Sequence, residues 1–141
     1  MAKPNQTAVT AISAVVGTLL LLVLVQAITG GLTAREVGHS GLVNAHAGIA
    51  YLVAVLAVAT VVIAAVMWRG KTGGQVVLIE SVVLLVLVII QIGLGQQIGK
   101  LSDKTGQHPG LLAVHIPVAL LVFGVGLHLS TFVSNLKRSS R

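Results

Sequence analysis

His39-Ser-Gly-Leu-Val-Asn-Ala-His46 recurs later in the chain as His108-Pro-Gly-Leu-Leu-Ala-Val-His115. Both copies read His-x-Gly-Leu-x-x-x-His, and both stand where a polar stretch gives way to a long apolar run. The two histidines of one copy are each separated by 69 residues from those of the other. Repetition at a fixed offset is the sequence signature of a duplicated structural unit. We therefore expect a fold made of two similar halves.

A second apolar run precedes each copy and ends in an aligned glutamine and glycine. These residues are Gln26 and Gly30 in the first half and Gln91 and Gly95 in the second, an offset of 65 residues. Because this offset is smaller than that of the histidines, the second connecting loop is longer than the first. The repeating unit is thus a pair of apolar segments joined by a polar loop that carries histidine.

The composition is typical of a membrane protein. Of the 141 residues, 55% are hydrophobic and 9% are charged, and the mean hydropathy is +1.01. A soluble domain of this size has too little interior to bury so much apolar surface. Runs long enough to cross a hydrocarbon core of about 30 Å occur four times. They predict helices over about 9–29, 43–68, 76–98 and 111–133 within one transmembrane domain, 1–141, whose repeats cover about 9–68 and 76–133.

The predicted fold class is all-α, a membrane-embedded up-down-up-down four-helix bundle with an internal two-helix pseudo-twofold repeat. Because each repeat crosses the membrane twice, the two copies share one orientation and are related by an axis along the membrane normal. Short loops place the second and fourth helices at diagonal corners of such a bundle. We therefore expect His46 and His115 at equal depth, facing each other across the bundle.

The positions of the charges predict the orientation. The net charge of +6 does not indicate nucleic acid, because the basic residues follow the distribution that sets membrane topology. One side has no acidic residue among its basic ones, which are Lys3, Arg69, Lys71, Lys137, Arg138 and Arg141. We expect a multi-pass protein of a bacterial cytoplasmic membrane, with both termini cytoplasmic and the histidine loops outside. The lipid bilayer is the expected partner, and both a homodimer and a larger respiratory-type complex stay open.

The paired histidines indicate a haem site. An ionisable side chain inside a membrane segment is costly and marks a functional position. Two neutral imidazoles bind haem iron from opposite sides, and the absence of cysteine excludes thiolate ligands and iron–sulfur clusters. We predict that His46 and His115 are the metal ligands of one haem b per chain. The alternative is that both are interfacial residues hydrogen-bonded to other helices.

Three residues near these histidines are further candidates for cofactor binding. Gly48 follows His46 by two residues and removes a side chain where a flat ring would press against the helix. Gln26 and Gln91 are candidates to hydrogen-bond the cofactor or the second nitrogen of a ligating imidazole. Contacts between helices are the alternative role for both glutamines.

The loop residues His39 and His108 are predicted to line the outer mouth of the site and to pair with haem propionates or with a second ligand. Arg35 of the first outer loop and Lys100 of the second are the candidate cationic helpers. An ordinary surface position is the alternative for both histidines. His128 has Ala59 as its repeat equivalent, so no second bis-histidine site is expected and His128 is predicted to make a polar contact. The role of Glu80 stays open between an interfacial position and a proton path.

The chain resembles one four-helix half of the haem A synthase family. The likeness is clearest in Gln91-Ile-Gly-Leu-Gly95 followed by Leu111-Leu-Ala-Val-His115, and it extends to the segment from Gln26 to His46. Members of that family carry histidines at the outer ends of the second and fourth helices of each half, so the resemblance implies the bundle and the haem-binding histidines. The chain departs from the catalytic half, which has glutamate and arginine where Leu42 and Ala47 stand here. It is also similar in plan to small four-helix membrane b-type cytochromes.

These observations favour an integral-membrane b-type cytochrome-like protein that transfers electrons or serves as a haem-bearing subunit, rather than an enzyme on its own. Two alternatives stay open. One is a haem A synthase-like enzyme that acts as a homodimer, and the other is a cofactor-free accessory subunit of a larger membrane complex.

Overall fold

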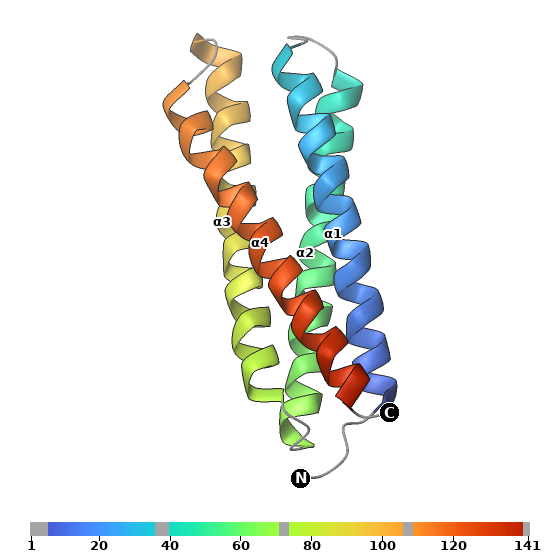
Figure 1. The fold of residues 1–141 in the computed structure, drawn as a ribbon. Coiled ribbons are helices and arrows are strands. Elements are labelled where there is room, and N and C mark those ends of the chain that lie inside the picture. Colours follow the sequence, from blue (N-terminus) through green and yellow to red (C-terminus); the bar gives the residue numbers. More distant parts are fainter. Residues whose placement is uncertain (1–5, 36–39, 71–73, 106–108, 140–141) are drawn as a thin grey trace.

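The protein is a bundle of four helices. The structure, a computed structural model, describes residues 6–35, 40–70, 74–105 and 109–139. The helices are α1 (Gln6–Arg35), α2 (Ser40–Arg69), α3 (Gly74–Thr105) and α4 (Pro109–Ser139). Figure 1 shows that α1 begins and α4 ends at the same end of the bundle, here named the terminal end. The opposite end, toward which His46 and His115 lie, is named the histidine end. The predicted all-α four-helix bundle is confirmed.

Each helix is longer than the apolar run that predicted it. α1 continues past residue 29 to Arg35, and α3 continues past residue 98 to Thr105. Hydropathy marks only the part of a helix suited to lipid, whereas the main-chain hydrogen bonds continue until a turn interrupts them. Lys100, expected in the second outer loop, therefore lies on α3. α4 begins directly at Pro109, because proline is tolerated in the first helical turn, where its missing N–H has no partner to lose.

All four helices have the length and apolarity needed to cross a membrane. The spans that meet these criteria are Gln6–Thr33, Gly41–Arg69, Gly74–Leu101 and Pro109–Ser139. At a rise of about 1.5 Å per residue, each exceeds a hydrocarbon core of about 30 Å. Many large aliphatic side chains on the outer surfaces are more than half exposed, among them Leu21, Val62, Ile89 and Leu120. The chain thus fits a multi-pass membrane protein.

Every helix packs against two neighbours. α1 and α3 each contact α2 and α4, and among the described residues no contact joins α1 to α3 or α2 to α4. α2 and α4 therefore occupy one diagonal of the bundle, as the repeat predicts.

The buried positions recur with the same offsets as the sequence motifs. The 65-residue offset relates Val9, Ile12, Val16 and Leu19 of α1 to buried residues of α3, namely Gly74, Val77, Ser81 and Leu84. The 69-residue offset relates Val53, Ala57, Thr60 and Ala64 of α2 to buried residues of α4, namely Val122, Gly126, Leu129 and Val133. Neighbouring buried positions are three or four residues apart, the spacing of knobs-into-holes packing. The pseudo-twofold repeat is therefore present in the packing of the core.

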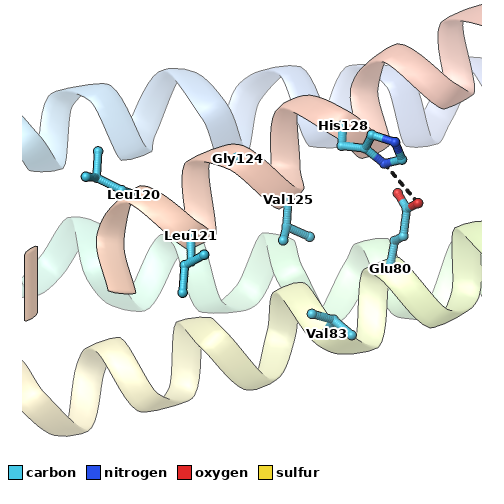
Figure 2. A pocket seen from close by; sticks show the side chains of 7 residues that line it. All are labelled: Glu80, Val83, Leu120, Leu121, Gly124, Val125 and His128. Carbon is cyan, nitrogen blue, oxygen red and sulfur yellow. Dashed lines mark ion pairs between the residues drawn. The ribbon is translucent and has the colours of Figure 1, made fainter. Parts of the chain in front are cut away.

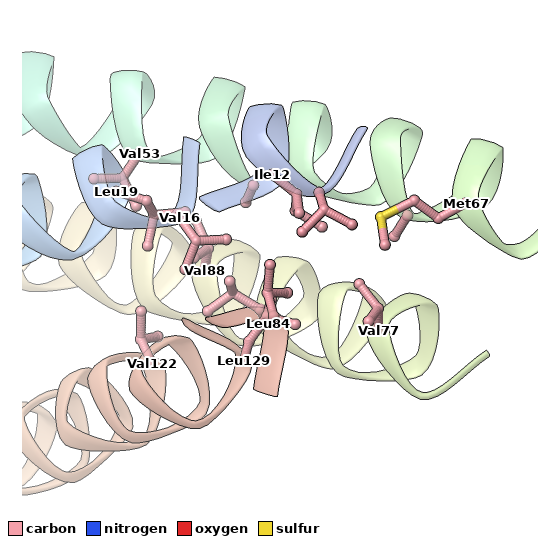
Figure 3. Close-up of a cluster of buried hydrophobic side chains, with 14 residues drawn as sticks. Ile12, Val16, Leu19, Val53, Met67, Val77, Leu84, Val88, Val122 and Leu129 are labelled. Atoms are coloured by element: carbon pink, nitrogen blue, oxygen red, sulfur yellow. The ribbon is translucent and has the colours of Figure 1, made fainter. Parts of the chain in front are cut away.

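The packed core occupies only the terminal half of the bundle. Figure 3 shows its side chains gathered between the helices. The last buried residues toward the histidine end are Leu19, Val53, Val88 and Val122. Beyond them, none of the residues whose exposure the structure describes is buried. Figure 1 shows the α1–α2 pair and the α3–α4 pair diverging in the same direction. The two repeats thus pack tightly at the terminal end and separate toward the histidine end.

Candidate functional site

His46 lies in the second turn of α2, and its half-buried imidazole packs against α1. A Cβ added at Gly30 would lie only 3.0 Å from His46 Cε1, so the ring rests against a stretch of helix that has no side chain. Thr29 Oγ1 lies 3.0 Å from His46 Nδ1. Gly30 thus supplies the surface on which this imidazole packs, and the neighbouring Thr29 supplies its polar partner.

The surroundings of Thr29 favour a proton on Nδ1 of His46. The Thr29 hydroxyl also lies 3.0 Å from the carbonyl oxygen of Val25 and 3.2 Å from that of Gln26. A hydroxyl has one hydrogen, and when Thr29 donates it to one of these carbonyl oxygens, its own oxygen accepts from His46 Nδ1–H. In this tautomer the lone pair of the neutral imidazole is on Nε2.

His115 occupies the equivalent position on α4 and packs against α3. A Cβ added at Gly95 would lie 3.5 Å from His115 Cε1, and Gly95 is the repeat equivalent of Gly30. Gln91 Nε2 lies 3.0 Å from His115 Nε2. The buried atoms Nδ1 of His115 and Oε1 of Gln91 have no hydrogen-bond partner. Each histidine therefore docks on the matching glycine of its own repeat, but Thr29 holds His46 through Nδ1 and Gln91 holds His115 through Nε2.

The two rings are oriented differently from the sequence expectation. The repeat predicts that His46 and His115 face each other across the bundle, whereas their described contacts are with the first helix of their own repeats. Both histidines do make the interhelical hydrogen bonds that the alternative interpretation expects, so each also contributes to helix packing.

The remaining predicted site residues fall into two groups. Gln26 is half-buried, and its Oε1 atom is buried without a partner. Gly48 is exposed, and a Cβ added there would meet nothing within 4 Å. His39 and His108 lie outside the described residues, as does the side chain of Arg35, whose main chain ends α1. The predicted outer mouth therefore stays a prediction.

Three residues near this site did not emerge from the sequence. Thr29 is one, and the other two are Gln96 and Tyr51, since Gln96 Nε2 donates to the Tyr51 hydroxyl at 3.2 Å and joins α3 to α2. The repeat equivalents of Thr29 and Tyr51 are Leu94 and Leu120, so comparison of the two halves does not mark them. The signal that would have found Thr29 is its position beside Gly30.

A second polar cluster lies farther toward the terminal end. Glu80 Oε1 on α3 lies 3.0 Å from His128 Nδ1 on α4, so His128 makes the polar contact that the sequence predicts. The pair borders a groove of about 310 Å³, shown in Figure 2, whose other lining residues are Val83, Leu120, Leu121, Gly124 and Val125.

Among the described residues, the candidate metal donors at the histidine end are the imidazoles of His46 and His115. Within residues 6–35, 40–70, 74–105 and 109–139, no group of three or more histidine, aspartate or glutamate side chains is placed to hold a metal ion. A protein zinc site usually needs three or four ligands, whereas haem brings four nitrogens of its own and needs at most two from the protein.

Comparison of the chain with protein-family models, with curated proteins and with solved structures finds no match. Its function is therefore inferred from its own residues.

Proposed function

We propose that this protein is an electron-transferring, b-type cytochrome-like membrane protein in which His46 and His115 bind one haem b. The observation that carries the proposal is the symmetric placement of the imidazoles. They occupy equivalent positions on the diagonal helices α2 and α4, and each lies against the equivalent glycine of its own repeat. A histidine that only stabilises the packing of two helices does not require a second histidine at the equivalent position of the other repeat.

Unpaired polar atoms at the histidine end support a ligand in this region. Oε1 of Gln26, Oε1 of Gln91 and Nδ1 of His115 are all buried without a hydrogen-bond partner. Within a membrane, an unsatisfied polar group costs several kcal/mol, about 2 or more. All three lie beyond the last buried layer of the core, where the two repeats diverge. A metal offers a partner to a lone pair on His115 Nδ1, whereas the two amide oxygens need a hydrogen-bond donor.

The chain's own residues prepare the two imidazoles for this role. Thr29 holds Nδ1–H of His46 and so leaves the Nε2 lone pair available to a metal. As placed, the Gln91 amide nitrogen donates to His115 Nε2. Gln91 performs the same task as Thr29 only with its amide turned over, so that Oε1 is paired and accepts from Nε2–H and the lone pair of the ring is on Nδ1. Haem held by two imidazoles supplies reversible one-electron transfer.

The spectrum of protein purified from a haem-sufficient host tests the proposal. We expect a reduced low-spin b-type spectrum that is lost in His46→Ala and in His115→Ala. His128→Ala is the matched control, because it removes a histidine from α4 outside the histidine end and is expected to keep the spectrum. The proposal fails if the native protein carries no haem, or if haem stays low-spin in both site variants.

We also propose that the terminal end faces a bacterial cytoplasm. Arg69, Lys137 and Arg138 lie in the last turns of α2 and α4, at that end, and cytoplasmic segments of membrane proteins are rich in lysine and arginine. The chain has no cysteine, so single cysteines report topology without background. A membrane-impermeant thiol reagent is expected to label Gly99→Cys in intact cells and Ser139→Cys only after permeabilisation. The reverse pattern would invert the orientation.

A further inference from the structure

The groove between α3 and α4 breaks the symmetry of the repeat. Three residues that shape it have aliphatic equivalents in the first repeat, where Glu80, Gly124 and His128 are replaced by Val15, Val55 and Ala59. The first repeat forms the same helices with these aliphatic residues. Helix formation therefore does not require the polar pair, and ionisable groups in a membrane segment are costly. Their presence in one repeat only calls for a role outside folding.

The geometry of the groove is that of a small binding site open to lipid. Figure 2 shows Glu80 reaching from α3 toward His128, with Gly124 one helical turn away on α4. A Cβ added at Gly124 would meet nothing within 4 Å, so the helix there presents bare main chain. The His128 side chain is 71% exposed although it lies within a span suited to cross a membrane. A side chain exposed within such a span is open to a lipid-soluble ligand.

The polar pair presents a hydrogen-bond donor to the groove. Glu80 Oε1 lies at Nδ1 of His128, so the other ring nitrogen, Nε2, is the one left for a ligand in the groove. When the carboxylate pairs with an imidazolium, or when a carboxylic acid donates its hydrogen to Nδ1, Nε2 carries a hydrogen. In these two arrangements the exposed nitrogen is a donor.

We propose that this groove binds a lipid-soluble molecule with a carbonyl oxygen on a flat ring, of the quinone type. The carbonyl oxygen accepts from His128 Nε2–H, the ring lies over Gly124, and an apolar tail extends into the lipid. The groove volume of about 310 Å³ suits a ring-sized head group, since pockets for small molecules begin at about 300 Å³. This proposal does not depend on haem binding.

Titration of the full chain with a quinone tests the proposal directly. The chain is labelled with ¹⁵N-histidine in phospholipid nanodiscs, and the probe is a decyl-substituted benzoquinone. The resonance of His128 is identified as the one absent from His128→Ala. We expect the Nε2–H proton of His128 to move downfield saturably as the quinone is added, because a new acceptor deshields the donated hydrogen. Decylbenzene, which has no carbonyl oxygen, is expected to cause no such shift.

Substitutions that introduce the residues of the first repeat test quinone binding, and we expect the fold to tolerate them. Gly124→Val and Glu80→Val place residues that already stand at the equivalent positions of α2 and α1. Gly124→Val fills the space beside the ring and is expected to weaken quinone binding at least about tenfold, and Glu80→Val is expected to abolish the His128 shift. Thr131→Val is the matched control, because it makes the same kind of exchange on α4 but does not line the groove.

Three results would overturn the proposal. One is that decylbenzene binds as tightly as the quinone, and another is that Gly124→Val binds the quinone as tightly as the native chain. The third is that the His128 Nε2–H shift is already present with phospholipid alone and does not respond to quinone. That third result would assign the groove to the ester carbonyl groups of lipids.

Discussion

At the scale of single residues, Gly30 is the point where the imidazole of His46 comes closest to another helix. Gly30→Ala would place a methyl group 3.0 Å from His46 Cε1, so the ring must move. Overpacking of this kind costs about 1–3 kcal/mol, against a gain of about 1 kcal/mol or less in helix propensity. We expect a lower free energy of unfolding in mixed detergent micelles. Gly31→Ala, where a Cβ meets nothing within 4 Å, is the matched control, and equal stability of the two variants would contradict the contact.

Thr29 is expected to orient His46 rather than only to pack beside it. Thr29→Val has nearly the same shape but removes the oxygen that accepts from His46 Nδ1–H. Changes to residues that orient a metal ligand typically weaken metal binding about 10–100-fold. We expect a rise in the haem Kd of that order in a haem titration of the purified apoprotein. Thr29→Ser keeps the oxygen and is expected to bind haem like the native chain, so equal affinity of the valine and native proteins would remove Thr29 from the site.

Comparison of the two halves predicts residues that the repeat shares and misses those that only one half carries. It correctly aligned Gly30 with Gly95, and these glycines contact the two histidines. It did not identify Thr29, whose equivalent is Leu94, or the Glu80–His128 pair, whose equivalents are aliphatic. The reason is physical. Whether two side chains on different helices meet depends on how the helices are shifted and rotated relative to each other. A residue that has no equivalent in the other half carries no sequence signal of that arrangement.

At the scale of the helices, Gly126 sets the approach of α4 to α1. A Cβ added at Gly126 would lie 3.0 Å from Leu20 Cδ2, the flexible end of a side chain, so alanine is accommodated by a small shift of Leu20. Gly126→Leu exceeds that space and is expected to cost about 1–3 kcal/mol of stability. Gly124→Leu, on the same helix with nothing within 4 Å, is expected to change the unfolding free energy little. Titration with a denaturing detergent measures both, and equal effects would show that Gly126 does not control this packing.

The hydropathy pattern does not predict where the helices end. The apolar runs placed all four helices correctly but stopped several residues short, because Arg35, Lys100 and Thr105 are polar yet remain helical. Polar residues end the lipid-suited part of a segment without ending its main-chain hydrogen bonds. The consequence is that the loops joining α1 to α2 and α3 to α4 are shorter than the sequence predicts.

At the scale of the whole molecule, stability is expected to come from the terminal half. Leu84 is fully buried there, and truncation to alanine is expected to cost about 2–5 kcal/mol because it leaves a cavity among packed side chains. Leu24 lies toward the histidine end and is 48% exposed, so Leu24→Ala is expected to cost far less. Unfolding of both variants in mixed micelles checks this difference. Equal losses would indicate that the histidine half is packed as tightly as the terminal half.

The most direct test concerns the axial ligands of the proposed haem. The central claim is that duplication has placed two imidazoles to bind one cofactor at the histidine end. Near-infrared magnetic circular dichroism of the oxidised, purified protein identifies the pair of axial ligands. The account predicts a low-spin signal of two imidazoles, with one haem per chain, that is lost in His46→Ala and His115→Ala. A high-spin signal in the native protein, an axial pair other than two imidazoles, or a protein that binds no haem would contradict it.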